Sequence, residues 1–206
     1  MATVLAGVAE AAMTRPKPED ANRLHHAQPP IVEAIPMSLI DRPLDYILAD
    51  HYRMRSVCGA LRRFAQTGQA TRIEADMVST FLEQDLPLHH DDEDQDLFPA
   101  VRRRALPEDD LGYALARLSA DHRLADPTVD TIIATLGATG NAAIVTLERP
   151  VQELMRAYAA SEHRHLAIEN GIVMAIARIR LKPADLKAIS RGMKHRRGVE
   201  VDVPHA

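Results

Sequence analysis

Four histidines could do chemistry because each interrupts a run of apolar residues spaced three and four apart. That spacing places the histidine on the apolar face of a helix. A buried imidazole without a partner costs about 1 to 3 kcal/mol. One such histidine is best explained by a hydrogen bond to a carbonyl or carboxylate, whereas four in one core favour a shared metal ion. The four are His51, His89, His122 and His165.

Two of these histidines are followed by a glutamate four residues later, in the pattern H-x-x-x-E. The pairs are His89 with Glu93 and His165 with Glu169. Residues four apart on a helix share a face, so each pair can present a nitrogen and a carboxylate to one ion or to two neighbouring ions. One such pair is common by chance on a helix surface, but two pairs within apolar stripes indicate a site. Nitrogen and oxygen ligands without thiolate suit iron, manganese or zinc rather than copper(I).

The elements that must position these side chains are amphipathic helices. The apolar spacing predicts helices over residues 44–65, 82–104, 111–136 and 147–179, and Pro183 stops the last of them. Pro87 and Pro127 fall inside the second and third helices, which they should kink or locally open. Because short connections force antiparallel neighbours, we expect an all-α fold, an up-down-up-down four-helix bundle. Counted from the intervening turn, His89 and His122 lie at nearly the same level.

The chain divides into three expected parts. Residues 1–40 contain several prolines among polar residues and are expected to form a flexible N-terminal arm, in which His25 and His26 are solvated. Residues 41–182 form the bundle. Residues 183–206 form a short extra C-terminal helix, at about 184–195, and a tail.

Composition limits the class of protein. A chain of 206 residues with 46% hydrophobic but only 3% aromatic residues suits one aliphatic helical core. The single cysteine, Cys58, excludes an intrachain disulfide and is consistent with a reducing compartment. A net charge of -4 gives no general attraction to nucleic acid or to an anionic membrane. Residues 1–14 lack the basic start of a secretory signal, and no apolar run is long enough to span a bilayer. We therefore expect a soluble, cytoplasmic protein.

A family resemblance rests on the second helix, where residues 89–99 read HHDDEDQDLFP. This segment resembles the H-H-x-x-E-E-x-x-L-F-P signature of hemerythrin-like HHE domains. The other helices agree: residues 50–51 (DH) followed by Arg55 look like the first-helix element, and residues 121–122 (DH) look like the third. Residues 165–170 (HLAIEN) look like the last. The resemblance covers about residues 42–182.

The resemblance implies a site with two non-heme iron ions joined by an oxo or hydroxo group. It implies that the four histidines are ligands and that Glu93 and Glu169 bridge or ligate the irons. The chain departs from the oxygen carriers of the family at Asp126, where they have a second histidine, and at Asn170, where they have aspartate. Asp126 is either a further ligand or the cap of a helix break before Pro127. These departures argue against simple reversible oxygen carriage.

Three functions remain open. The first is binding or sensing of a small ligand, namely oxygen, nitric oxide, peroxide or iron itself. The second is a di-iron enzyme that degrades peroxide or oxidises ferrous iron, and the third is a metal-free helical interaction module. No nucleic acid or membrane partner is expected, and the sequence identifies no protein partner.

Several neighbours are interpreted as supporting residues rather than ligands. His90 and Asp94 lie off the apolar seam and are expected near the ligands or at the surface, and His163 is expected to be solvated. Arg55 orients a ligand through an acidic side chain or lies at the surface, and Cys58 is expected to be a buried, inert thiol. Tyr158 is expected mainly to fill space, with a hydrogen bond into an iron pocket as the alternative. Residues 194–197 are expected to be a solvated tail.

Overall fold

The computed structural model describes residues 32–138, 140 and 142–199, and helices dominate them. The predicted all-α class is confirmed. The helices are η1 (Met37–Asp41), α2 (Pro43–Thr67), α3 (Arg72–Thr80), η2 (Phe81–Asp85), α4 (Leu86–Asp91), η3 (Asp92–Leu97), α5 (Phe98–Arg104), η4 (Pro107–Asp109), α6 (Gly112–Gly137), α7 (Arg149–Ile168), η5 (Glu169–Val173), α8 (Met174–Arg180) and α9 (Pro183–Arg196). The strands are β1 (Gln69–Thr71) and β2 (Ile144–Thr146).

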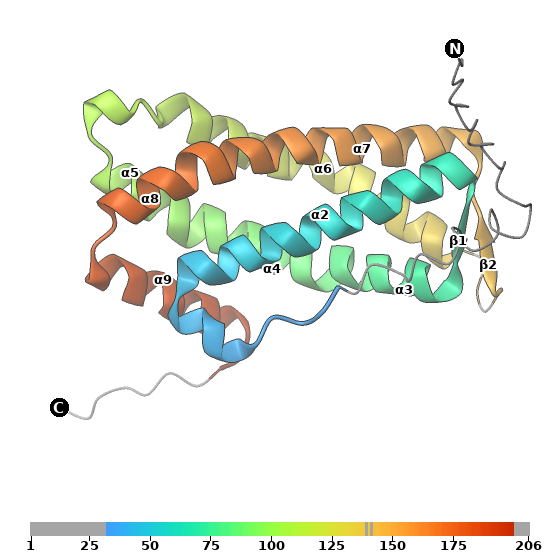
Figure 1. The fold of residues 1–206 in the computed structure, drawn as a ribbon, viewed down its shortest axis with the longest axis horizontal. Coiled ribbons are helices and arrows are strands. Elements are labelled where there is room, and N and C mark those ends of the chain that lie inside the picture. The colour runs from blue at the N-terminus through green and yellow to red at the C-terminus, as the bar shows by residue number, and fades with distance from the viewer. Residues whose placement is uncertain (1–31, 139, 141, 200–206) are drawn as a thin grey trace, which may run out of the picture.

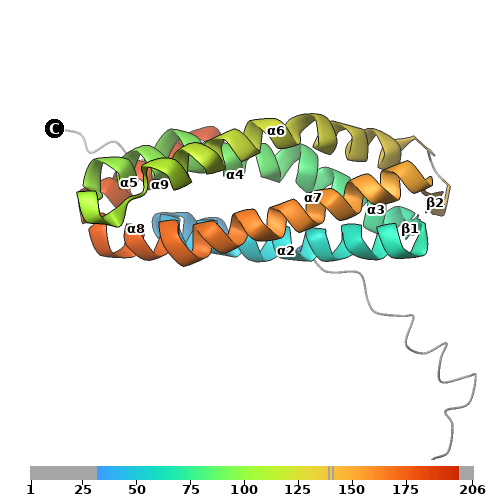
Figure 2. The ribbon, with the colours of Figure 1, turned by 90° about the horizontal axis from the view of Figure 1, so that it is seen from above.

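Several of these helices join end to end, so the chain forms four long helical runs. They are α2 alone, α3 through α5, α6 alone, and α7 through α8. The runs lie side by side along the long axis of the molecule, and α9 packs beside the first turns of α2 (Figure 1). The second view shows the same arrangement, with the run from α3 to α5 beside α6 and that from α7 to α8 beside α2 (Figure 2).

The runs are not α-helical throughout, because η2, η3 and η5 are π-helical segments. In the second run, η2 and η3 each end two residues before a proline, Pro87 or Pro99. A proline cannot donate to the carbonyl four residues earlier, and its ring crowds that carbonyl. A wider preceding turn relieves both problems. The opening expected at Pro87 therefore takes the form of a π-segment, whereas α6 continues through Pro127 as one helix.

A glycine ends the first run, and a capping box begins the second. Gly68 follows α2 in the left-handed region, with φ of 71°, and its amide donates to the Phe64 carbonyl. An added Cβ at this position would lie 3.1 Å from Gln152 Nε2, so glycine is favoured here. The second run then begins with a reciprocal capping box between Thr71 and Glu74.

A small antiparallel pairing of β1 with β2 joins two of the connections, which the sequence did not predict. Its register places Gln69 opposite Thr146, Ala70 opposite Val145 and Thr71 opposite Ile144. Ala70 and Val145 point inward and are buried, while their neighbours are exposed. The pairing closes the end of the bundle away from α9 (Figure 1).

The hydrophobic core is divided into two clusters along the long axis. One lies toward the β1–β2 end and extends to Met54, Leu86, Val129 and Leu166. The other lies toward α9 and begins at Ile47, Leu97, Leu118 and Val173. On the first three runs the site residues fall between the two clusters, and on the fourth Glu169 does, whereas His165 lies one residue before Leu166 of the first cluster. The structure thus brings the four histidines to one level, as the sequence analysis requires.

Parts of the expected tails lie outside the described residues. This applies to residues 1–31, including His25 and His26, and to residues 200–206. Within 32–40, the chain enters η1, and Ile40 is buried against the core. No helix of the described part is both long and apolar enough to cross a membrane.

Candidate metal centre

Six buried side chains converge at the level where the two core clusters part. Each is at most 6% exposed. Their ligand atoms form two groups, in each of which all the atoms lie within 4.8 Å of one another. The first group is His51, His89, Glu93 and Glu169, and the second is Glu93, His122, His165 and Glu169. Both glutamates therefore belong to both groups.

In the first group, His51 comes from α2 and His89 from α4, and the Nε2 atom of each lies near carboxylate oxygens. His51 Nε2 lies 3.2 Å from Glu93 Oε1 and 3.5 Å from Glu169 Oε2. His89 Nε2 lies 3.6 Å from Glu93 Oε2. The two imidazole rings meet edge to face, with centroids 5.0 Å apart.

In the second group, the histidines come from α6 and α7. His165 Nε2 lies 2.9 Å from Glu169 Oε1, and His122 Nε2 lies 3.5 Å from Glu93 Oε2 and 3.9 Å from Glu169 Oε1. The Nε2 atoms of His122 and His165 are 3.1 Å apart. Each glutamate thus faces histidines of both groups, which is the placement that a carboxylate bridging two ions requires.

Buried polar atoms show that these residues fit cations. Glu93 Oε2 and both carboxylate oxygens of Glu169 are buried without a well-aligned hydrogen bond among the described residues, and Glu169 Oε1 has only the ion-pair contact with His165 Nε2. Leaving such an acceptor unsatisfied costs about 1 to 3 kcal/mol, and more when it is charged. Metal ions between the converging Nε2 and oxygen atoms would satisfy all three oxygens. The donor set, imidazole and carboxylate, fits iron, manganese or zinc.

The outer ring nitrogens of His51 and His122 are hydrogen-bonded to polar side chains, and that of His165 lies near a carboxylate without a hydrogen bond to it. His51 Nδ1 lies 2.9 Å from Asn170 Oδ1, and His122 Nδ1 lies 2.9 Å from Asp94 Oδ2. His165 Nδ1 lies 3.9 Å from Asp121 Oδ2. Partners of this kind fix the ring orientation and leave Nε2 free for a metal.

The histidine pKa values show how the site balances its two carboxylates without a cation. Burial lowers the pKa of His51, but the hydrogen bond to Glu93 and the charge of Glu169 outweigh it and raise that pKa to about 9. Burial likewise lowers the pKa of His165, and the contact with Glu169 raises it to about 9. Burial raises the pKa of Glu93, and the adjacent charge of Glu169 raises it further. Protons therefore offset negative charge that a bound cation would offset instead.

The two shared glutamates lie in π-segments. Glu93 is the second residue of η3, and Glu169 is the first of η5. A π-turn inserts one residue into the helix and occurs frequently at functional sites. The H-x-x-x-E spacing placed each glutamate on the face of its histidine, but it gave no sign of the wider turn that follows.

The other residues that the sequence singled out belong to neither group. Asp126 is exposed and belongs to neither group, so the structure does not bring it to the other predicted ligands. The His90 ring stacks on the His122 ring, with centroids 4.0 Å apart and planes 10° apart. Arg55 is exposed, and its guanidinium lies over the Tyr52 ring. His163 contacts Arg62 away from the centre.

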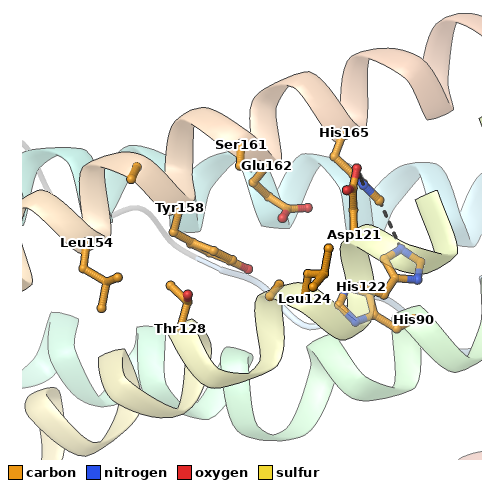
Figure 3. A pocket seen from close by; sticks show the side chains of 12 residues that line it. His90, Asp121, His122, Leu124, Thr128, Leu154, Tyr158, Ser161, Glu162 and His165 are labelled. Atoms are coloured by element: carbon orange, nitrogen blue, oxygen red, sulfur yellow. Dashed lines mark hydrogen bonds and ion pairs between the residues drawn. The ribbon is translucent and has the colours of Figure 1, made fainter. Parts of the chain in front are cut away.

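A cavity of about 300 Å³ between α6 and α7 reaches the second group (Figure 3). His122 and His165 are among its lining residues, whereas His51 and His89 are not. Glu162, which the sequence analysis missed, also lines it and is 8% exposed. Glu162 could have been identified from its position three residues before His165, because residues three apart share a helical face.

Comparison with known proteins agrees with the geometry. The model of the hemerythrin HHE cation binding domain matches residues 42–180. Comparisons with curated proteins and with solved structures gave no match. The matched residues include all six side chains of the centre and most of the helical structure. The chain belongs to the hemerythrin HHE cation-binding domain family.

Proposed function

We propose that this chain holds two non-heme iron ions, one in each group, and presents them to a small ligand such as oxygen, nitric oxide or peroxide. The observation that carries the proposal is that both groups share Glu93 and Glu169. Each ion would be held by two imidazoles and by the two shared carboxylates, which together offer nitrogen and oxygen ligands. When bound, such an iron pair supplies a change of oxidation state and an exchangeable coordination position. An oxo or hydroxo bridge, the up-down-up-down connectivity and a cytoplasmic location belong to the same proposal.

The protein's own residues orient the site and keep bulk water away from it. Asn170 and Asp94 hold the outer nitrogens of His51 and His122, so that both Nε2 atoms face inward. The apolar clusters on either side of the centre exclude water along the bundle axis. The low dielectric that results strengthens the attraction between a cation and the carboxylates.

Metal analysis tests the proposal directly. Protein produced in iron-supplemented medium is expected to carry two irons per chain and to absorb in the near-ultraviolet and visible range. A folded protein that takes up no metal would leave only the metal-free interaction module. One iron per chain would refute the two-ion centre.

An enzyme that degrades peroxide or oxidises ferrous iron is the second candidate, because the cavity gives a reactant a path to His122 and His165. Steady gas evolution from hydrogen peroxide that a His89→Ala substitution abolishes would favour this enzyme over a binding or sensing protein. Reversible oxygen carriage is less well supported. Asp126, which stands where the oxygen carriers have a histidine, is exposed and outside both groups.

A further inference from the structure

The two halves of the candidate centre differ in their access to the cavity. The cavity touches the histidines of the second group, His122 and His165, and neither histidine of the first. Its volume of about 300 Å³ exceeds what a ligand of two or three heavy atoms needs. The second group is therefore the half that an external molecule can reach through this cavity.

Polar groups line the cavity beside that half. The Tyr158 side chain is 5% exposed, and its hydroxyl has no hydrogen-bond partner among the described residues. In Figure 3 its ring lies along the cavity, with the hydroxyl directed toward the His165 side. A buried tyrosine hydroxyl usually finds a partner. A molecule in the cavity beside this hydroxyl would satisfy it.

A carboxylate lies next to that hydroxyl. Glu162 stands one helical turn after Tyr158 and three residues before His165, and all three line the cavity. Its carboxylate points along the cavity toward His165 (Figure 3). Asp121, at the same end, adds a second carboxylate. Such a lining accepts hydrogen bonds from a protic molecule and repels an anion.

We infer that the external ligand binds in the cavity at the His122–His165 half of the centre, and that it is a small, uncharged, protic molecule of the hydrogen peroxide type. The Tyr158 hydroxyl donates a hydrogen bond to one end of this ligand, and the Glu162 carboxylate accepts one from it. This inference rests on the proposed function, since it assigns a place and a chemical class to the ligand of the same centre.

Iron content tests the proposed function, and ligand affinity tests the inferred ligand site. Iron is measured first in the wild type and in every variant, together with the circular dichroism spectrum. Wild-type protein that takes up no iron refutes the proposed function. If iron is present, the inference is judged on two probes alone, azide and hydrogen peroxide.

Azide affinity is measured by titrating the iron-loaded protein and following its visible absorbance. Tyr158→Phe is expected to raise the azide dissociation constant about tenfold, the loss of one hydrogen bond to a charged acceptor. The matched control is Tyr113→Phe, since Tyr113 is 78% exposed on α6. Ser161→Trp fills the cavity from its exposed rim and is expected to abolish azide binding. Ala160→Trp, at an exposed neighbouring position, is expected to leave it unchanged.

The chemical class is tested by Glu162→Leu, which removes both the charge and the acceptor. Azide is expected to bind more tightly to this variant because a like charge is gone. The rate constant with which hydrogen peroxide oxidises the ferrous protein, two ferrous ions giving two ferric ions and the peroxide giving two hydroxides, is expected to fall several-fold, opposite in direction to the azide affinity. Changes in the same direction for both probes would overturn the assigned class. Unchanged azide affinity in Tyr158→Phe and Ser161→Trp, with full iron content, would overturn the location.

Discussion

Arg197 Nη2 lies 2.6 Å from Asp92 Oδ2, and Asp92 is the residue before the shared ligand candidate Glu93. Asp92 is fully buried, and it also accepts from Arg196, at 2.9 Å. The Arg197 guanidinium in addition covers the Tyr46 ring. These contacts hold the C-terminal end of α9 against η3, the π-segment that contains Glu93. The interpretation of residues 194–197 as a solvated tail is wrong, because Arg196 and Arg197 are partners of a buried carboxylate.

Removing that carboxylate is expected to destabilise the fold strongly. Asp92→Ala leaves two largely buried guanidinium groups without their shared partner, and such a change costs about 3 to 5 kcal/mol. Urea unfolding followed by circular dichroism measures the effect. The control is Glu153→Ala, which removes an exposed ion pair with Arg149 and is expected to change stability by less than about 1 kcal/mol. A loss as small as that of the control would mean that α9 is not held by this cluster.

The features that periodicity determines could be predicted from the sequence. Side chains at three-and-four spacing must share a helical face, so His51, His89, His122 and His165 could be assigned to one core. The H-x-x-x-E pattern then placed Glu93 and Glu169 beside two of them. These six side chains are the ones that the structure brings together.

What the sequence could not show depends on contacts between distant segments and on small changes of helical register. The π-turns at Glu93 and Glu169 add one residue without any break in the apolar pattern. The bond from His51 to Asn170 joins residues 119 apart, and no local rule predicts it. The pairing of β1 with β2 involves only three residues on each side, too few for a strand pattern.

Asp94 is expected to tune metal affinity without touching the metal. Its carboxylate accepts from His122 Nδ1 at 2.9 Å and from the Ser119 hydroxyl. Asp94→Ala frees the His122 ring to rotate, and loss of such a partner lowers metal affinity roughly 10- to 100-fold. Competition with a coloured chelator measures the change, and Asp130→Ala, an exposed change on α6, is the control. Equal affinity in the Asp94 and Asp130 variants would contradict this role.

The capping box of α3 is expected to make stability depend on pH. Burial acts to raise the pKa of Glu74, but bonds from Thr71 and from Arg63, at 2.6 Å, outweigh it and lower that pKa. A folded-state pKa below the unfolded value contributes stability above about pH 4.3, and the contribution is lost as pH falls through the folded pKa.

Glu74→Gln tests this sign. The variant is expected to be less stable than the wild type at pH 7, by roughly 1 kcal/mol, and the difference should shrink below about pH 4. Thermal unfolding of metal-free protein at several pH values gives the comparison. Asp76→Asn, at a position whose side chain is 61% exposed, serves as the control. A difference that grows toward acid pH would show that Glu74 is not stabilised in its charged form.

Cys58 is expected to be chemically inert in the folded protein. Its side chain is fully buried, and burial raises the pKa of the thiol to about 12. The thiolate is the reactive form, so both access and ionisation oppose reaction. An aromatic disulfide reagent is expected to label almost no protein in buffer at pH 8 and one thiol per chain in denaturant. Rapid labelling of the native protein would place the thiol at the surface.

The assignment of the ligands predicts a sharp contrast within one helix. His165 faces both shared glutamates, whereas His163, two residues earlier, contacts Arg62 outside the centre. His165→Ala is expected to lose most of the iron because it removes one of two imidazoles in its group, and His89→Ala is expected to do the same in the other group. His163→Ala should keep the wild-type content, since it changes the same residue type on the same helix at a position outside the centre. Elemental analysis beside circular dichroism distinguishes loss of metal from loss of fold. Free imidazole added to His165→Ala should restore part of the iron by entering the vacated space beside the cavity, and equal iron content in the His163 and His165 variants would show that the inward-facing ring is not a ligand.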